Sequence, residues 1–265
     1  MRALDHEQRR QLHERRWMRP VEAVLARGEL QVLGGPVCRA RLAARHLPHW
    51  GAQSWGVLTG THEPMVHEAL RRTLGAGDVF VDIGCNVGYT AMVAASIVGP
   101  QGRVVALDAQ RECAEATALH ARLNGVGQLE AAHAAAAAHS GAAEVIVTED
   151  SLWSRLASVG EHELEVRRDL VPAIAGDELL ERFGLARIDV VKIDVDGAEL
   201  DVIAGMQRLL ADQRPVVICE MHGRNAEFHA ALEALSYRVV NLDGREAVPE
   251  AAPNAHVLCE PLVLA

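Results

Sequence analysis

The sequence predicts an α/β protein built on a mostly parallel sheet with helices on both faces. From about residue 61 onward, helical and strand patterns alternate along the chain. The strand segments are continuous apolar runs, which is typical of parallel strands buried on both faces. Two final strands, 237–241 and 255–260, follow one another without a long helix between them and indicate an antiparallel edge.

The individual elements follow from apolar spacing and end signals. A helix is expected over 63–74, with Pro64 in its first turn. Strand 79–83 then leads through a glycine turn into helix 88–98, which Gly99-Pro100 ends. The remaining expected strands are 103–107, 128–132, 144–148, 188–193 and 215–220, and the remaining expected helices are 111–123, 176–183, 198–210 and 224–235.

The chain is predicted to divide into an N-terminal extension, residues 1–59, and one larger domain, residues 60–265. Arginines between apolar residues over 1–31 favour one or two amphipathic helices. We expect them to pack as a cap, and a homodimer through this extension is possible. Residues 37–60, around Trp50 and Trp55, favour a small hairpin or loop.

Bulk composition excludes several classes of protein. The chain has 265 residues, a 49% hydrophobic content and a formal net charge of −10. The negative charge disfavours a nucleic-acid partner, because phosphate binding needs clustered cations. The absence of a long apolar run or a signal peptide predicts no membrane association and a cytoplasmic location. The five scattered cysteines are expected to be reduced.

The most informative motif is the turn after strand 79–83, which contains Asp82, Gly84, Asn86 and Gly88 and is followed by Tyr89. Glycines there allow close approach of the backbone to a ligand, and the next helix offers free N–H groups. A carboxylate at Asp82 would repel phosphate but attract an ammonium group. The predicted cofactor is therefore S-adenosylmethionine and not a dinucleotide.

Further cofactor-binding residues are expected after the next two strands, because ligands of open parallel sheets bind beyond the carboxyl ends of the strands. Asp108 lies about 20 residues beyond the glycine turn, where a carboxylate can bind ribose hydroxyls. The alternative is that Asp108 caps the helix starting near Arg111. Ala109 follows Asp108, and the small residues Ala134 and Ala135 would leave room for adenine.

A second strand ends in a carboxylate-rich turn at Lys192, Asp194 and Asp196. These three side chains would share one face while the strand stays extended. They favour one another's charged forms, which makes an internal ion pair the alternative to a catalytic role. Lys192 and Asp194 are both predicted to be catalytic residues, and Asp194 is the residue most expected to lie at the reaction centre. Asp194 is also predicted to contact the cofactor.

The next strand ends in Glu220 and His222. A histidine with a carboxylate in reach is a plausible general base for a hydroxyl group. Alternatively, Asp194, Glu220 and His222 would bind a divalent cation. No spacing in the sequence fixes metal geometry, so the favoured prediction has no metal.

The motifs taken together resemble the FkbM family of S-adenosylmethionine-dependent methyltransferases over roughly residues 60 to 262. The segments that carry the resemblance are 60–64 (GTHEP), 82–89 (DIGCNVGY), 192–199 (KIDVDGAE) and 220–222 (EMH). The resemblance implies a class I methyltransferase (Rossmann-like) fold with a seven-stranded sheet. It also implies O-methylation of a hydroxyl on a sugar, polyketide or other small metabolite.

The chain departs from the family pattern at three positions. Cys85 stands where alanine is usual, Asp108-Ala109 replaces Glu-Pro, and Asp196 replaces glutamate. These changes leave cofactor binding as expected but do not identify the acceptor, which we expect to contact residues 1–59 and 149–172. The alternatives are N-methylation of a small molecule and a catalytically inactive, cofactor-binding partner subunit.

Overall fold

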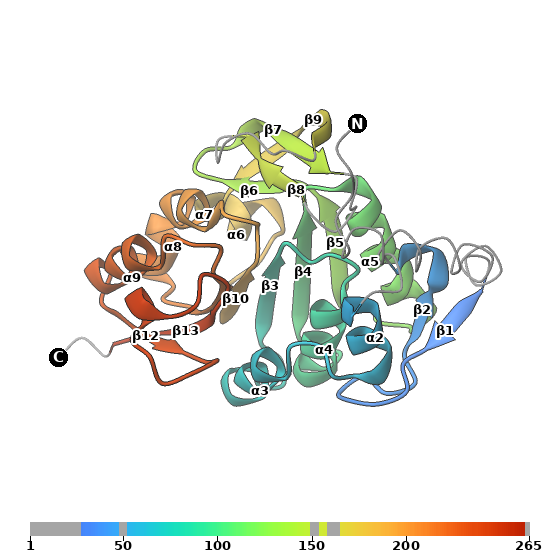
Figure 1. Ribbon diagram of the computed structural model, residues 1–265. Coiled ribbons are helices and arrows are strands. Elements are labelled where there is room, and N and C mark those ends of the chain that lie inside the picture. Colours follow the sequence, from blue (N-terminus) through green and yellow to red (C-terminus); the bar gives the residue numbers. More distant parts are fainter. Residues whose placement is uncertain (1–27, 48–51, 149–153, 158–164, 263–265) are drawn as a thin grey trace, which may run out of the picture. The chain divides into compact units, whose positions relative to one another are not determined.

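A computed structural model describes residues 28–47, 52–148, 154–157 and 165–262 (Figure 1). The chain divides between His62 and Glu63 into two compact units, which are described separately. In the first unit, β1 (Glu29–Gln31) pairs antiparallel with β2 (Arg41–Ala43). The short helix η1 (Ala44–His46) and helix α2 (Ala52–Thr59) follow.

The structure bears on two predictions for the first unit. The amphipathic helices expected over 1–31 lie outside the described residues except at the end, where Glu29–Gln31 is a strand. Helix α2 occupies a segment for which a hairpin or loop was predicted. Ser54, Val57 and Leu58 are buried at helical spacing, which explains the helix.

The second unit contains the predicted seven-stranded sheet (Figure 1). Six strands run in the same direction, and β13 runs antiparallel to both of its neighbours, β11 and β12. This is the strand order of a class I methyltransferase, and it confirms the predicted antiparallel edge. From one edge to the other the strands are β12 (Tyr237–Asn241), β13 (His256–Pro261), β11 (Val216–Glu220), β10 (Val190–Ile193), β3 (Val79–Ile83), β4 (Arg103–Asp108) and β5 (Leu129–His133).

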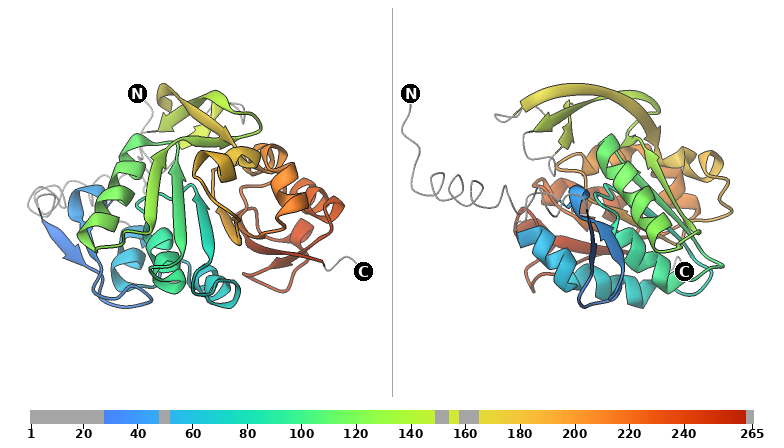
Figure 2. Two further views of the ribbon diagram at one scale, coloured as in Figure 1. Left: turned by 180° about the vertical axis from the view of Figure 1, so that it is seen from behind. Right: turned by 90° about the vertical axis from the view of Figure 1, so that its right-hand side faces the viewer.

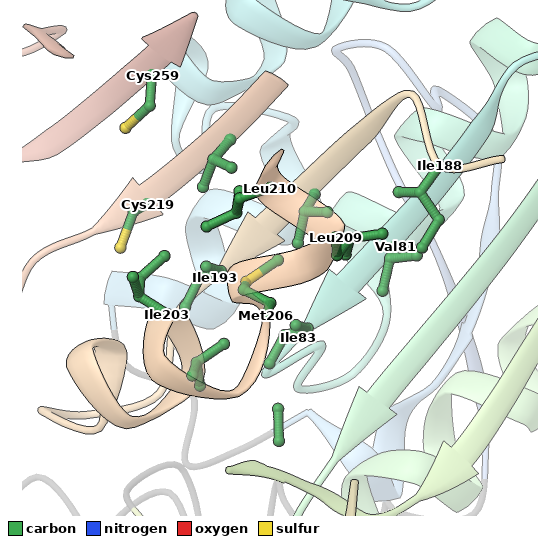
Figure 3. Close-up of a cluster of buried hydrophobic side chains, with 14 of the residues drawn as sticks. Val81, Ile83, Ile188, Ile193, Ile203, Met206, Leu209, Leu210, Cys219 and Cys259 are labelled. Atoms are coloured by element: carbon green, nitrogen blue, oxygen red, sulfur yellow. The ribbon is translucent and has the colours of Figure 1, made fainter. Parts of the chain in front are cut away.

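The main core lies between this sheet and the helices that follow β10 and β11. Val81, Ile83 and Ile193 of the strands share this core with Ile203 and Met206 (Figure 3). On the opposite face of the sheet, Phe80, Val104 and Ile218 are also fully buried. The described helices of this unit are α3 (Pro64–Thr73), α4 (Tyr89–Val98), α5 (Arg111–Leu123), η3 (Gly176–Glu178), α6 (Leu179–Arg182), α7 (Glu199–Gly205), α8 (Gln207–Asp212), α9 (Asn225–Ala234) and η4 (Val248–Glu250).

A second sheet of four strands is inserted between β5 and α6 (Figure 2). It is formed, in spatial order, by β6 (Ala135–Ala137), β9 (Glu165–Ala175), β7 (Gly141–Thr148) and β8 (Ser154–Leu156). Its apolar face packs against Ala109, Val195 and Ala198, which follow β4 and β10. The inserted sheet therefore covers part of the carboxyl edge of the main sheet.

The inserted sheet is the main feature that was not predicted. Of its strands, only part of β7 was expected, as 144–148. The predicted helix 198–210 is also wrong in one respect, because it is two helices, α7 and α8, that meet at Met206. A Cβ at Gly205 would overlap the carbonyl oxygen of Ala137, so α7 ends in direct contact with β6. Among the described residues, no helix is long and apolar enough to cross a membrane.

Candidate functional site

The glycine turn, residues 82–89, links β3 to α4 and depends on two glycines with positive φ. Gly84 has φ +80°, and a Cβ there would overlap the carbonyl oxygen of Asp194. Gly88 has φ +77°, and a Cβ there would lie 2.6 Å from the side chain of Thr117 on α5. Only glycine combines these backbone angles with such close contacts. The turn is thus packed tightly against both its neighbouring turn and α5.

Asp82 is the most unusual residue of the glycine turn. Its side chain is fully buried, and neither carboxyl oxygen has a hydrogen-bond partner among the described residues. Burial raises the pKa of Asp82 to about 7, and the nearby Lys192 opposes this rise. An unpartnered buried carboxyl group costs free energy unless a donor reaches it. Asp82 is therefore suited to receive a cationic or hydrogen-bonding group from a ligand.

Asp108, at the end of β4, holds the glycine turn in place. Its Oδ2 accepts a hydrogen bond from the Asn86 N–H, and its Oδ1 accepts one from the Gln110 N–H, both at 2.8 Å. Burial raises the pKa of Asp108 to about 7 despite these two bonds. The N-cap of α5 is Gln110, so the alternative that Asp108 caps this helix is wrong. A carboxylate accepts about four hydrogen bonds, so capacity remains for a ligand.

Other predicted cofactor residues surround the same turn. Tyr89 is buried, and its ring contacts His67 of α3 at a centroid distance of 5.3 Å. Ala134 and Ala135 are buried beyond β5, and the Ala134 N–H donates to the Asp108 carbonyl oxygen. Ala109 packs against the inserted sheet. The structure therefore brings the predicted cofactor residues to one end of β3, β4 and β5.

Sequence reasoning missed two residues of α5 that support the glycine turn. The Thr117 hydroxyl donates to the Asn86 carbonyl oxygen at 3.0 Å. A ring nitrogen of His120 lies 2.8 Å from the Val87 carbonyl oxygen, and both side chains are fully buried. Polar residues on the apolar face of a predicted amphipathic helix are the signal that could have identified them.

The second predicted turn places Lys192 and Asp194 together at the end of β10. The Lys192 Nζ lies 3.0 Å from the Asp194 Oδ2. Burial would lower the pKa of Lys192, but Asp194, Glu63 and Asp82 raise it well above its usual value. The lysine is charged and neutralises Asp194. In register, Lys192 also pairs with Asp82 across β10 and β3, so it connects the two turns.

Asp196 does not share the face of Lys192 and Asp194, because the strand ends at Ile193 and Asp196 has φ +50°. Its carboxylate instead lies 3.5 Å from the Nε2 of His222. The Nδ1 of His222 donates to Glu199 at 2.8 Å. The carboxylate partner of His222 is therefore Glu199, at the start of α7, and not the expected Glu220.

These contacts fix the protonation state of His222. Burial would lower its pKa, but the hydrogen bond to Glu199 and the nearby Asp194 and Asp196 raise it to about 9. At neutral pH the ring is an imidazolium with acceptors on both sides. Asp194, Asp196, Glu199, Glu220 and His222 form one group, here termed the carboxylate–histidine cluster.

Glu220 lies at the edge of this cluster, at the end of β11. Its carboxylate accepts no hydrogen bond from the described residues, and the Nε2 of His256 lies 3.7 Å from its Oε2. Burial, together with Asp194 and Glu63, raises the pKa of Glu220 to about 7, whereas His256 and His222 lower it. A carboxylate with this pKa can accept a proton near neutral pH.

Two overlapping sets of side chains have ligand atoms within 4.8 Å of one another. One is the predicted set Asp194, Glu220 and His222, so the predicted convergence of these three groups is confirmed. The other, Glu63, Glu220 and His256, was not predicted. The spacing would admit a divalent ion in either set, but it also follows from the ion pairs described above.

Known proteins match parts of this chain. The Methyltransferase FkbM domain family matches residues 82–242, more than half of the chain. The hexuronic acid methyltransferase AglP of Haloferax volcanii is 36% identical over 70 residues, which are 26% of this chain and 29% of that protein.

Two solved structures show similar folds at low identity. The methyltransferase FkbM of Methylobacillus flagellatus is 13% identical with a TM-score of 0.45, covering 92% of this chain and 59% of that one. An S-adenosylmethionine-dependent O-methyltransferase of Thermotoga maritima is 16% identical with a TM-score of 0.45, covering 76% and 66%. On the family match, this chain belongs to the methyltransferase FkbM domain family.

Proposed function

We propose that the chain is an S-adenosylmethionine-dependent O-methyltransferase that acts on a hydroxyl group of a small metabolite. The observation that carries the cofactor assignment is Asp82, a fully buried carboxyl group without a hydrogen-bond partner among the described residues. It lies in the glycine turn, where Gly84 and Gly88 hold the backbone at positive φ. The ammonium group of the cofactor would supply the missing donor.

The other predicted residues fit the rest of this cofactor. Asp108 would accept hydrogen bonds from the ribose, and the small side chains of Ala134 and Ala135 would lie against the adenine ring. Gly84, Asn86, Gly88, Tyr89 and Ala109 would line the same end of the sheet, with Asp194 beside them. When bound, S-adenosylmethionine supplies an electrophilic methyl group.

The acceptor would bind at the carboxylate–histidine cluster. We assign Glu220 as the general base, because its carboxylate accepts no hydrogen bond from the described residues and its pKa of about 7 suits proton transfer. Asp194, neutralised by Lys192, and the imidazolium of His222 would orient the hydroxyl. His222 itself already carries its proton at neutral pH, which disfavours it as the base.

The similarity to a hexuronic acid methyltransferase favours a sugar hydroxyl as the acceptor. The net charge of −10 disfavours a nucleic acid. The chain can be incubated with S-adenosylmethionine carrying a deuterated methyl group and with methyl glucuronoside, methyl glucoside or an amino sugar. Mass spectrometry and NMR of the product then distinguish O-methylation from N-methylation, and methylation of the amine alone would contradict the proposal.

The assignment of the base is tested by substitution. Glu220→Gln should reduce turnover by about 10² to 10⁴ while the dissociation constant of S-adenosylmethionine stays nearly constant. His222→Gln should cost less, because it removes an orienting charge and not the proton acceptor. Glu227→Gln, an exposed substitution on α9, is the matched control. A larger loss in His222→Gln than in Glu220→Gln would return the role of base to His222.

A further inference from the structure

The antiparallel edge of the sheet adds a second histidine–carboxylate pair beside the proposed base. Glu220 and His256 are directly paired across β11 and β13. The Oδ2 of Asp243, in the loop after β12, accepts hydrogen bonds from the Nδ1 of His256 at 3.0 Å and from its backbone N–H at 2.7 Å. The two bonds to one oxygen fix both the backbone and the ring of His256.

This orientation directs the other ring nitrogen at the base. The Nε2 of His256 is buried, has no hydrogen-bond partner among the described residues, and lies 3.7 Å from the Glu220 Oε2. In a neutral ring with its proton on Nδ1, the Nε2 lone pair would face a carboxylate oxygen and repel it. In the charged ring, the same nitrogen carries a proton and attracts Glu220.

We infer that Asp243 and His256 are positioning residues that keep Glu220 ionised and oriented for removal of the acceptor proton. Asp243 holds the ring, and a proton on the Nε2 of His256 would stabilise the Glu220 carboxylate that it faces. The proton of the acceptor hydroxyl moves to the Oε2 of Glu220. The charged His256 ring beside this oxygen favours later release of the proton. The inference deepens the proposed function and rests on Glu220 as the base.

Other charged groups face Glu220 and act on it at the same time. Asp194 from the end of β10 and Glu63 at the N-cap of α3 disfavour its ionised form, whereas His222 favours it together with His256. Asp196 also lies within electrostatic reach of Glu220. His256 is the one among these that a separate element, the loop after β12, holds by two hydrogen bonds.

The inference is tested by NMR titration of the Glu220 side-chain carboxyl carbon in the full chain without any acceptor. Because an opposite charge within about 4–6 Å lowers a carboxyl pKa by roughly 1 to 3 units, His256→Gln should raise the pKa of Glu220 by a shift of that order. Asp243→Asn should shift it in the same direction by less. His229→Gln is the matched control, because His229 forms an ion pair with Glu233 on the outer part of α9.

Activity gives the second measurement. In the pH profile of kcat/KM, the acidic limb should move to higher pH in His256→Gln, as activity requires the ionised Glu220. A purely structural role would lower kcat/KM evenly at all pH values. An unchanged Glu220 titration in His256→Gln would overturn the inference. Because that titration needs no methyl transfer, failure of the proposed function would appear separately, as the absence of methylated product.

Discussion

The glycine turn and the carboxylate–histidine cluster lie at the same edge of the sheet but differ in how their charges are balanced. In the glycine turn, Asp82 is fully buried and accepts no hydrogen bond from the described residues. In the cluster, Asp194 pairs with Lys192 at 3.0 Å and Glu199 pairs with His222 at 2.8 Å. In the first region no described residue donates a hydrogen bond to Asp82, whereas in the second region each of these two carboxylates has a cationic partner.

The difference indicates what each region does. A buried carboxyl group without a partner is stabilised when a ligand brings a positive charge, so the glycine turn is suited to binding. Carboxylates that are already paired, such as Asp194 and Glu199, are held in defined positions and are suited to orienting a hydroxyl. Glu220, whose carboxylate accepts no hydrogen bond from the described residues, is suited to accepting the proton.

The largest expected effect comes from Gly84→Ala, because Gly84 joins the two regions. Its new Cβ would overlap the Asp194 carbonyl oxygen and occupy a backbone position with φ +80°. We expect the dissociation constant of S-adenosylmethionine, measured by isothermal titration calorimetry, to rise at least about 100-fold, which corresponds to about 2.7 kcal/mol.

Gly127→Ala is the control, because nothing lies within 4 Å of its added Cβ and its φ is not positive. Circular dichroism of both variants separates loss of binding from loss of the fold. If folded Gly84→Ala binds the cofactor like the wild type, the glycine turn is not the binding site.

Asp82→Asn should weaken cofactor binding less than Gly84→Ala does. It distinguishes the two regions more directly, because it changes a carboxylate of the glycine turn alone. Removing one charge-assisted hydrogen bond corresponds to roughly 1.5–3 kcal/mol, so affinity for S-adenosylmethionine should fall about 10-fold to 150-fold. Because the pKa of Asp82 in the free protein is about 7, binding of an ammonium group should lower it and release protons at pH 7.

Calorimetry at pH 7 in two buffers of different ionisation enthalpy measures that release. It should be clear in the wild type and reduced in Asp82→Asn. Asp212→Asn, at an exposed position at the end of α8, is the control. Equal proton release in wild type and Asp82→Asn would show that Asp82 does not receive the ammonium group.

Much of this arrangement was predictable, because the strands that carry the site are buried apolar runs with a carboxylate at one end. Val79–Ile83 is buried at all five positions, and such runs are parallel strands with few alternatives. Asp82, Asp108, Asp194 and Glu220 lie at or next to the carboxyl ends of such strands. Parallel strands bring those ends together, so their convergence followed from the fold.

The inserted sheet and the positioning pair were not predictable in the same way. Strand β9 includes Arg167, Arg168 and Pro172, and β6 consists of alanine alone, so neither has the apolar pattern of a buried strand. His256 lies at the first residue of an antiparallel strand, where the amino end meets the carboxyl end of β11. A search for site residues at the carboxyl ends of strands therefore misses His256.

The smallest expected effect is that of metal chelation on turnover, which would act through the carboxylate–histidine cluster. Asp194, Glu220 and His222 are close enough to bind an ion, but Lys192 and His222 already provide positive charge beside Asp194. We therefore expect turnover to survive dialysis against EDTA and to be unchanged by added Mg²⁺.

Loss of turnover on chelation with recovery in Mg²⁺ would show instead that an ion lowers the pKa of the hydroxyl and orients it. In that case Glu220→Gln should weaken metal binding, which a titration with Mn²⁺ followed by electron paramagnetic resonance would detect. The same titration in wild type decides whether the balance of charges in the cluster is complete without a metal.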